Sequence, residues 1–245
     1  MKKLLLYGTT ILLFTLAAMY FAFNEKLPKG ENSKKADELA TKMLTALNKT
    51  AWDSTNVLAW TSTDGHDFVW HKKAELVQVK WGKNNVLLNL KEWNKGEVLV
   101  ENKKITDESL DVIRGKAWAL FCNDSFWLIA PYKIFDAGVS RTIVVNKDGS
   151  DALLVSYATG GVTPGDSYLW VLDKNYVPTS YKMWVKIIPI GGVPATWENW
   201  TTTETGAIIA TKHKLGPVNL TIENLRTGQN LQEIGVNTDL FDKIK

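Results

Sequence analysis

The chain has 245 residues, a length that suits a single all-β domain, and its hydrophobic content of 45% is sufficient for a globular core. The formal net charge is +3, and lysine and arginine are scattered rather than clustered. The charge pattern of a nucleic-acid-binding protein is therefore missing, and no nucleic acid is expected as a partner.

The N-terminus has the pattern of an export or membrane-targeting segment. Lys2 and Lys3 precede an uncharged apolar stretch over residues 4–23, and a membrane-spanning helix needs about 20 such residues. We therefore predict that residues 1–24 are a signal anchor in the cytoplasmic membrane, which places the domain in the periplasm. Leu16-Ala17-Ala18 also fits a small-residue cleavage site, so secretion after cleavage stays open.

A single cysteine limits the covalent chemistry of the chain. Cys122 lies far from the end of the apolar stretch, where a lipoprotein would carry its lipidated cysteine, and it has no partner for an internal disulfide. Within Ala119-Leu120-Phe121-Cys122 it is expected to be a small buried hydrophobic residue rather than a nucleophile.

The mature part of the chain begins with a short linker and a helix. Residues 25–34 are polar and contain Pro28 and Gly30, which predicts a polar linker, and the domain is expected over 35–245. Leucine and methionine recur at helical spacing over 35–47, which predicts a helix that packs on a sheet through one apolar face.

Short segments of alternating polarity, separated by turn residues, predict an antiparallel meander. A second helix is predicted from Thr106 to about Phe121, ended by Asn123-Asp124, and 126–132 is predicted to be extended up to Pro131. The predicted strands cover residues 57–62, 67–71, 75–81, 85–90, 97–101, 141–145, 152–157, 168–172, 180–190, 195–203, 207–213 and 219–225.

The stretch Gly160–Asp173 carries the main prediction about the fold. Pro164-Gly165 predicts a turn with a positive φ at the glycine, and the strand that follows is apolar on both faces, as is 180–190. A strand with one face in water does not have this pattern. We predict a mainly β (α+β) fold, a strongly curved antiparallel half-barrel with helices packed across its concave side.

No sequence feature indicates catalysis. His66 and His71 are five residues apart, and they are expected to be exposed turn residues rather than metal ligands. The nucleophile-elbow, phosphate-loop and zinc-protease motifs are missing. We therefore expect a non-enzymatic protein without metal or cofactor, and a hydrolase that uses His66 or His71 is the least favoured alternative.

The concave face is the predicted binding site, because ligand sites are hollow and mostly apolar. The chain contains 11 tryptophans, and tryptophan suits the wall of an apolar pocket. Core packing without any ligand explains the same residues equally well if the helices fill the hollow. The candidate ligand-binding residues are Trp118, Trp127, Tyr132, Trp170, Met183 and Trp184.

Three segments resemble a known family. The runs Phe126–Lys133, Asp136–Val139 and Gly161–Tyr168 are similar to those of exported Bacteroidetes-type proteins of undefined function. That family is allied to the periplasmic lipoprotein-carrier (Lol-like) half-barrel superfamily. The resemblance would cover residues 35–245, and it implies that acyl chains or another apolar ligand bind in the hollow. A membrane anchor departs from a freely shuttling carrier.

Two functions follow from these observations. The first is an envelope protein that binds a lipid, an acyl chain or a lipidated protein, such as the acyl chains of a lipoprotein. The second is an envelope module for protein–protein interaction, with a solid core and no ligand.

Overall fold

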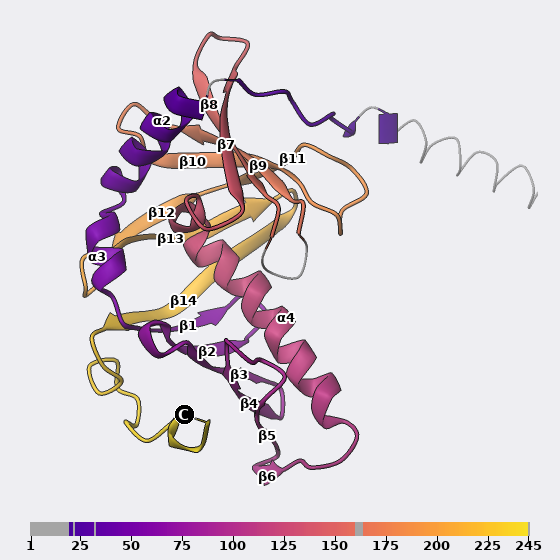
Figure 1. Ribbon diagram of the computed structural model, residues 1–245, viewed down its shortest axis with the longest axis vertical. Helices are drawn as coiled ribbons and strands as arrows, with labels where there is room; N and C mark the ends of the chain where they lie inside the picture. The colour runs from indigo at the N-terminus through magenta and orange to yellow at the C-terminus, as the bar shows by residue number, and fades with distance from the viewer. Residues whose placement is uncertain (1–19, 22, 32, 160–163, 245) are drawn as a thin grey trace, which may run out of the picture.

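The computed structural model describes residues 20–21, 23–31, 33–159 and 164–244. Across these residues the chain is mostly β, with 14 strands in one antiparallel sheet that does not close into a barrel (Figure 1). A long helix crosses one face of the curved sheet. The predicted fold class is therefore confirmed.

The strands follow one another along most of the sheet. From one edge to the other the order is β6-β5-β4-β3-β2-β1-β14-β13-β11-β10-β9-β8-β7, and β12 pairs with β13 beside this path. The strands are β1 (Val57–Ser62), β2 (Asp67–His71), β3 (Leu76–Trp81), β4 (Asn84–Asn89), β5 (Gly96–Val100), β6 (Lys103–Lys104), β7 (Val139–Val145), β8 (Asp151–Tyr157), β9 (Ser167–Leu172), β10 (Pro178–Trp184), β11 (Val193–Thr196), β12 (Glu198–Thr202), β13 (Ile208–Leu215) and β14 (Val218–Gly228). Pairing of β1 with β14 joins the two halves of the chain.

Helices α2, α3 and α4 accompany the sheet. Helix α2 (Ser33–Ala46) packs on β7 and β8, α3 (Lys49–Ser54) leads into β1, and α4 (Leu110–Ile129) crosses the sheet diagonally (Figure 1). The 3₁₀ turns are η1 (Lys72–Ala74), η2 (Ala130–Lys133) and η3 (Asp242–Ile244).

The sequence prediction was wrong about the end of the second helix. Helix α4 continues through Asn123 and Asp124 to Ile129, and 126–132 is helix followed by a 3₁₀ turn rather than an extended run. The buried residues Ala117, Phe121, Ser125 and Leu128 recur every three or four residues. This spacing continues one helix face through the polar residues that were expected to end it.

Two predicted strands are also shorter than expected. Strand β10 ends at Trp184, so residues 185–190 belong to a loop, although their sequence is apolar. The predicted strand 195–203 is divided at Trp197 into β11 and β12. The positive φ expected at Gly165 is present, at 103°, while residues 160–163 of that stretch lie outside the described residues.

Both faces of the sheet are apolar, as the doubly apolar strands predicted. The large core lies on the inner face, between the sheet and α4, where Trp60, Trp170 and Tyr181 are almost completely buried. On the outer face of β1–β4, residues 231–241 cover a smaller cluster that includes Ile234 and Phe241. A third cluster lies on the outer face of β8–β10.

The predicted linker lies along the protein surface. Glu31 forms an antiparallel bridge with Ile143 of β7, and Glu25 forms an ion pair with Lys182 of β10. Apart from Tyr20, Phe21 and Phe23, the predicted anchor 4–23 lies outside the described residues. In the part of the chain that the structure describes, no helix combines the length and the apolar character needed to cross a membrane.

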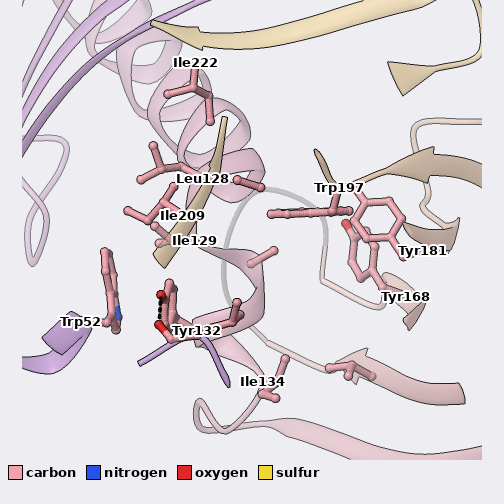
Figure 2. Packing of buried hydrophobic residues seen from close by; sticks show 14 of the residues in the cluster. Trp52, Leu128, Ile129, Tyr132, Ile134, Tyr168, Tyr181, Trp197, Ile209 and Ile222 are labelled. Carbon is pink, nitrogen blue, oxygen red and sulfur yellow. Dashed lines mark hydrogen bonds between the residues drawn. The ribbon is translucent and has the colours of Figure 1, made fainter. Parts of the chain in front are cut away.

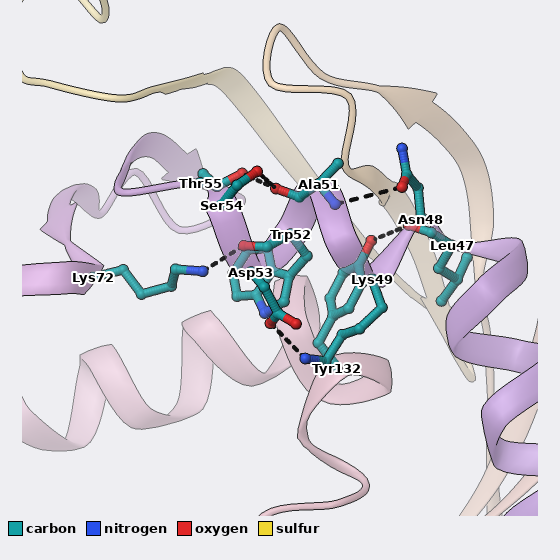
Figure 3. A network of polar contacts seen from close by, with 10 residues as sticks. All are labelled: Leu47, Asn48, Lys49, Ala51, Trp52, Asp53, Ser54, Thr55, Lys72 and Tyr132. Carbon is teal, nitrogen blue, oxygen red and sulfur yellow. Dashed lines mark hydrogen bonds and ion pairs between the residues drawn. The ribbon is translucent and has the colours of Figure 1, made fainter.

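One buried hydroxyl joins three parts of the fold near α3. Tyr132 of η2 stacks on Trp52 of α3, with ring centroids 4.7 Å apart. Its hydroxyl lies 2.7 Å from the carbonyl oxygens of Leu47 and Ile208, and it accepts a hydrogen bond from the amide of Ile208. The junction of helix α2, helix α3 and strand β13 is therefore held at a single side chain (Figure 3).

We predict that Tyr132→Phe lowers the free energy of unfolding by about 1–3 kcal/mol, because buried backbone groups lose their partner. Urea denaturation measures the change. The matched control is Tyr176→Phe, because the Tyr176 ring is exposed. This variant should change the free energy of unfolding by no more than about 0.5 kcal/mol. Equal losses in the two variants would contradict this role of the Tyr132 hydroxyl.

Candidate functional site

The candidate site lies between α4 and the inner face of the sheet. The backbone of α4 lies close to strands β3, β4 and β5 on one side and to strand β13 on the other. Strands β2, β1 and β14 lie between these in the sheet order. Aromatic side chains fill the depth between the helix and the sheet, in two groups along the helix.

The first aromatic group lies on β1 and β2. Trp60 and Phe68 are cross-strand neighbours whose rings stack with centroids 4.6 Å apart. Trp70, on the same face, meets Phe121 of α4 edge to face at 5.4 Å. Phe121 thereby fixes the middle of the helix over these two strands.

The second aromatic group surrounds Trp127, farther along α4. Its ring lies 5.8 Å from Tyr181 and 6.4 Å from Trp197, and Trp170 lies 5.0 Å from Trp197. In Figure 2 the rings of Trp197, Tyr181 and Tyr168 lie side by side, at some distance from Tyr132. These side chains come from β9, β10 and the junction between β11 and β12.

The structure brings together three of the six predicted ligand-binding residues. Trp127, Trp170 and Met183 belong to the second group or adjoin it, since Met183 is the cross-strand neighbour of Tyr168. Trp118 lies nearer the start of α4, where it stacks on Trp93. These four residues share the inner face.

The other two predicted residues do not belong to the second aromatic group. Tyr132 belongs to the junction with α3 described above, where the protein itself satisfies its hydroxyl. Trp184 is on the outer face, packed against the cluster on β8–β10, and its indole donates a 2.7 Å hydrogen bond to the carbonyl of Glu25. Adjacent residues of a strand point to opposite faces of the sheet, so Trp184 and Met183 cannot both face the hollow.

Four indole N–H groups on the inner face have no hydrogen-bond acceptor among the described residues. They belong to Trp60, Trp70, Trp170 and Trp197. By contrast, the indoles of Trp184 and Trp200 donate to backbone carbonyls. Because a buried indole normally finds a partner, the inner face carries more hydrogen-bond donors than the protein itself uses.

His213 is the buried titratable group of the second aromatic group. Its side chain packs against Trp197, with ring centroids 4.4 Å apart, and Nδ1 donates a hydrogen bond to the carbonyl of Thr196 at 3.1 Å. Burial lowers the pKa of His213 to about 4. At neutral pH the ring is therefore uncharged, and no charge from His213 is buried in this region of the inner face.

The remaining chemistry-bearing side chains are dispersed. His66 was expected to be an exposed turn residue, but it is mostly buried, and its Nδ1 lies 2.8 Å from a carboxylate oxygen of Asp124 on α4. Burial raises the pKa of the Cys122 thiol to about 12, which opposes its action as a nucleophile. Across the described residues, no three His, Cys, Asp or Glu side chains are grouped as metal ligands would be.

The outer face of the sheet carries a groove. It has a volume of about 850 Å³ and lies between β1–β3, β14 and residues 236–240 of the C-terminal tail. Ala59, Val69 and Leu240 line its apolar part, and Lys80 and Asn224 line its polar part. No sequence signal indicated this groove, because it depends on where the tail lies.

The comparisons with known proteins assign no family. No family model matches the chain, and no curated protein matches it. A solved structure of a DUF1329 family protein from Desulfovibrio piger is similar, with a TM-score of 0.43 and 14% identity over 85% of this chain and 96% of that one. So distant a likeness carries no inference about function, and the resemblance to exported Bacteroidetes-type proteins and lipoprotein carriers stays a prediction.

We predict that His213 makes the protein less stable in acid. Because the folded pKa of about 4 lies below the unfolded value of 6.5, the full stability is present above pH 6.5 and is lost as the pH falls toward 4. Between pH 7.5 and 5.0 this group should remove roughly 2 kcal/mol.

Urea denaturation of the wild type and His213→Gln at both pH values isolates this contribution, since the variant keeps every other titrating group. The wild type should lose more stability than the variant on acidification. Equal losses would show that His213 can be protonated in the folded protein without penalty.

Proposed function

We propose that the protein is a non-enzymatic binding protein of the cell envelope that holds an acyl chain or another apolar ligand between α4 and the sheet. The observation that carries this proposal is the set of four unpaired indole N–H groups on the inner face. The surrounding side chains are apolar or aromatic, so an occupant of this region is mostly apolar.

The four unpaired indoles favour acceptor atoms on the ligand, while the unpaired His213 Nε2 and the Tyr157 hydroxyl on the same face can meet a ligand donor. An indole N–H donates a hydrogen bond and cannot accept one. Leaving such a donor buried without an acceptor costs about 1–3 kcal/mol. A ligand whose polar atoms are acceptors, such as the carbonyl oxygens of an acyl ester or a carboxyl group, would offset that cost.

Ligand entry requires α4 to shift, because the helix covers the inner face. Two polar ties hold it in the described structure. Asp124 pairs with His66 in the turn between β1 and β2, and Arg114 donates hydrogen bonds to the carbonyls of Asn94 and Gly96. We propose that α4 acts as a lid that moves away from the sheet at its N-terminal end, because η2 follows Ile129 directly and Tyr132 fixes the C-terminal end to the domain.

The sequence supports the cellular location. Two lysines and an uncharged apolar stretch begin the chain, as in a segment that directs a domain across the cytoplasmic membrane or holds it there. We propose a periplasmic domain anchored in that membrane by residues 4–23.

We predict that the purified full chain carries an apolar ligand, detected as an added mass by native mass spectrometry. Replacing Trp170 and Trp197 with phenylalanine removes two donors but keeps most of the ring volume. Affinity for a fluorescent fatty acid should then fall by about 10-fold or more, since each hydrogen bond contributes about 1 kcal/mol.

Trp184→Phe is the matched control, because it removes an indole on the outer face and should leave fatty-acid affinity unchanged. The proposal fails if no mass is added and no fatty acid binds. It fails equally if the control weakens binding as much as the double replacement does.

The second candidate is an envelope module for protein–protein interaction with a solid core. Two observations favour it. The inner side chains pack closely against one another, and the groove of about 850 Å³ lies on the opposite face. In this case the partner would bind across β1–β3 and the tail.

This candidate predicts that a partner recovered from envelope extracts is lost with Val69→Asp combined with Lys80→Glu, because the two changes alter the floor and the rim of the groove. Affinity should fall at least 10-fold in a quantitative binding assay, while Trp170→Phe leaves it intact. The reverse pattern would contradict binding at the groove and favour the inner face.

A further inference from the structure

The loop between β10 and β11 is apolar and extends beyond the sheet. It covers residues 185–192, with the sequence Val-Lys-Ile-Ile-Pro-Ile-Gly-Gly. Val185 is still part of the inner core, whereas 72% of Ile187 is exposed. An isoleucine this exposed in a loop of further apolar residues is not explained by packing within the domain.

This loop is fastened to the segment that follows the predicted anchor. The amide of Glu25 donates to the carbonyl of Gly191 at 2.9 Å, and the amide of Gly191 donates to the side chain of Asn24 at 2.8 Å. The carboxylate of Glu25 also forms an ion pair with Lys182 at 2.6 Å.

The two glycines at the end of the loop make this close approach possible. A Cβ on Gly191 would lie 2.3 Å from the Trp184 ring and 2.6 Å from the Glu25 carbonyl oxygen. A Cβ on Gly192 would lie 2.6 Å from the Glu25 Cβ. The segment around Glu25 and the end of the loop, which are far apart in sequence, therefore pack directly against each other.

Apart from Glu25, whose carboxylate is paired with Lys182, the exposed side chains around this contact are apolar or basic. Tyr20, Phe21, Phe23 and Leu27 are exposed by 42%, 81%, 63% and 46%. Lys26, Lys29 and Lys186 are also exposed. We call the exposed side chains among residues 20–21, 23, 26–29 and 186–190 the juxtamembrane patch.

We propose that the juxtamembrane patch rests on the surface of a lipid bilayer, with Ile187 inserted beside the point where the chain leaves the membrane. The proposal builds on the predicted anchor at 4–23, which is part of the proposed function. Asn24 directly follows that apolar stretch and is bonded to Gly191, so the loop must lie close to the end of the stretch.

The residue types match the layers of a membrane surface. Aromatic side chains concentrate at the membrane–water boundary, and exposed lysines are attracted to anionic headgroups by about 1 kcal/mol each. A protein partner would not need to lie beside the anchor, whereas a bilayer does. The contact would hold the domain in one orientation, where a flexible linker would let it rotate freely.

The test places an environment-sensitive fluorophore in the loop of the full chain. Ile187→Cys is labelled with a nitrobenzoxadiazole dye in a Cys122→Ala background, and the protein is reconstituted into nanodiscs of phosphatidylethanolamine and phosphatidylglycerol. The control is Lys103→Cys on β6, at the opposite edge of the sheet (Figure 1). We expect a blue shift and at least 2-fold quenching by brominated lipid at position 187, and neither at position 103.

Equal, water-like emission at both positions would overturn the proposal. A chain that fails to enter nanodiscs would also overturn it, and in that case the predicted anchor fails too. Fatty-acid binding by the same samples is measured separately, so failure of the membrane contact is distinguishable from failure of the proposed ligand site.

A second test uses Ile187→Glu. This variant should keep the fold, because the Ile187 side chain is on the surface. Tryptic cleavage after Lys186 is measured in nanodiscs and in detergent, because a glutamate beside the scissile bond itself slows trypsin. The ratio of the detergent rate to the nanodisc rate should be at least 5-fold higher for the unlabelled wild type than for this variant, and equal ratios would contradict burial of the loop in the bilayer.

Discussion

Helix α4 is held against the curved sheet by apolar contacts, and the packing elsewhere in the domain follows from them. The helix is apolar around much of its circumference. Ala117, Phe121 and Leu128 are buried, and Trp118 and Trp127 on its flanks pack against the same core. Such a helix needs apolar cover over most of its surface, and an open sheet bent around it supplies that cover. The large aromatic side chains of the inner face follow from this arrangement, since they fill the depth between helix and sheet.

The outer face is covered by the two ends of the described chain. Residues 24–31 lie against β7, β10 and the β10–β11 loop, and residues 231–241 lie over β1–β4. Strands that are apolar on both faces therefore find cover on both sides. This explains why a segment as polar as 25–34 is bound to the domain, since its backbone and side chains supply hydrogen-bond partners along the outer face.

Local sequence patterns were sufficient for the strands and the curved sheet, because alternation and turn residues act over short distances. The predictions from these patterns were wrong where contacts between distant segments determine where an element ends. The apolar run at 185–190 is a loop because β10 loses its pairing partners after Trp184, and 126–129 remains helical because the buried face of α4 continues through Ser125. For the site, the structure groups Trp127, Trp170 and Met183 in one core, but Trp127 reaches it from α4 and not from the extended run predicted over 126–132. The sequence could not place Tyr132 or the outer groove, which depend on contacts between segments distant in sequence.

We propose that a ligand binds between α4 and the sheet. A high-resolution crystal structure of the full chain, purified without removing bound lipid, would show whether this is so. We expect elongated density along α4, with an acceptor atom within hydrogen-bond distance of the Trp170 or Trp197 indole nitrogen. An inner face closed by protein side chains, with only single water molecules at those nitrogens, would contradict it.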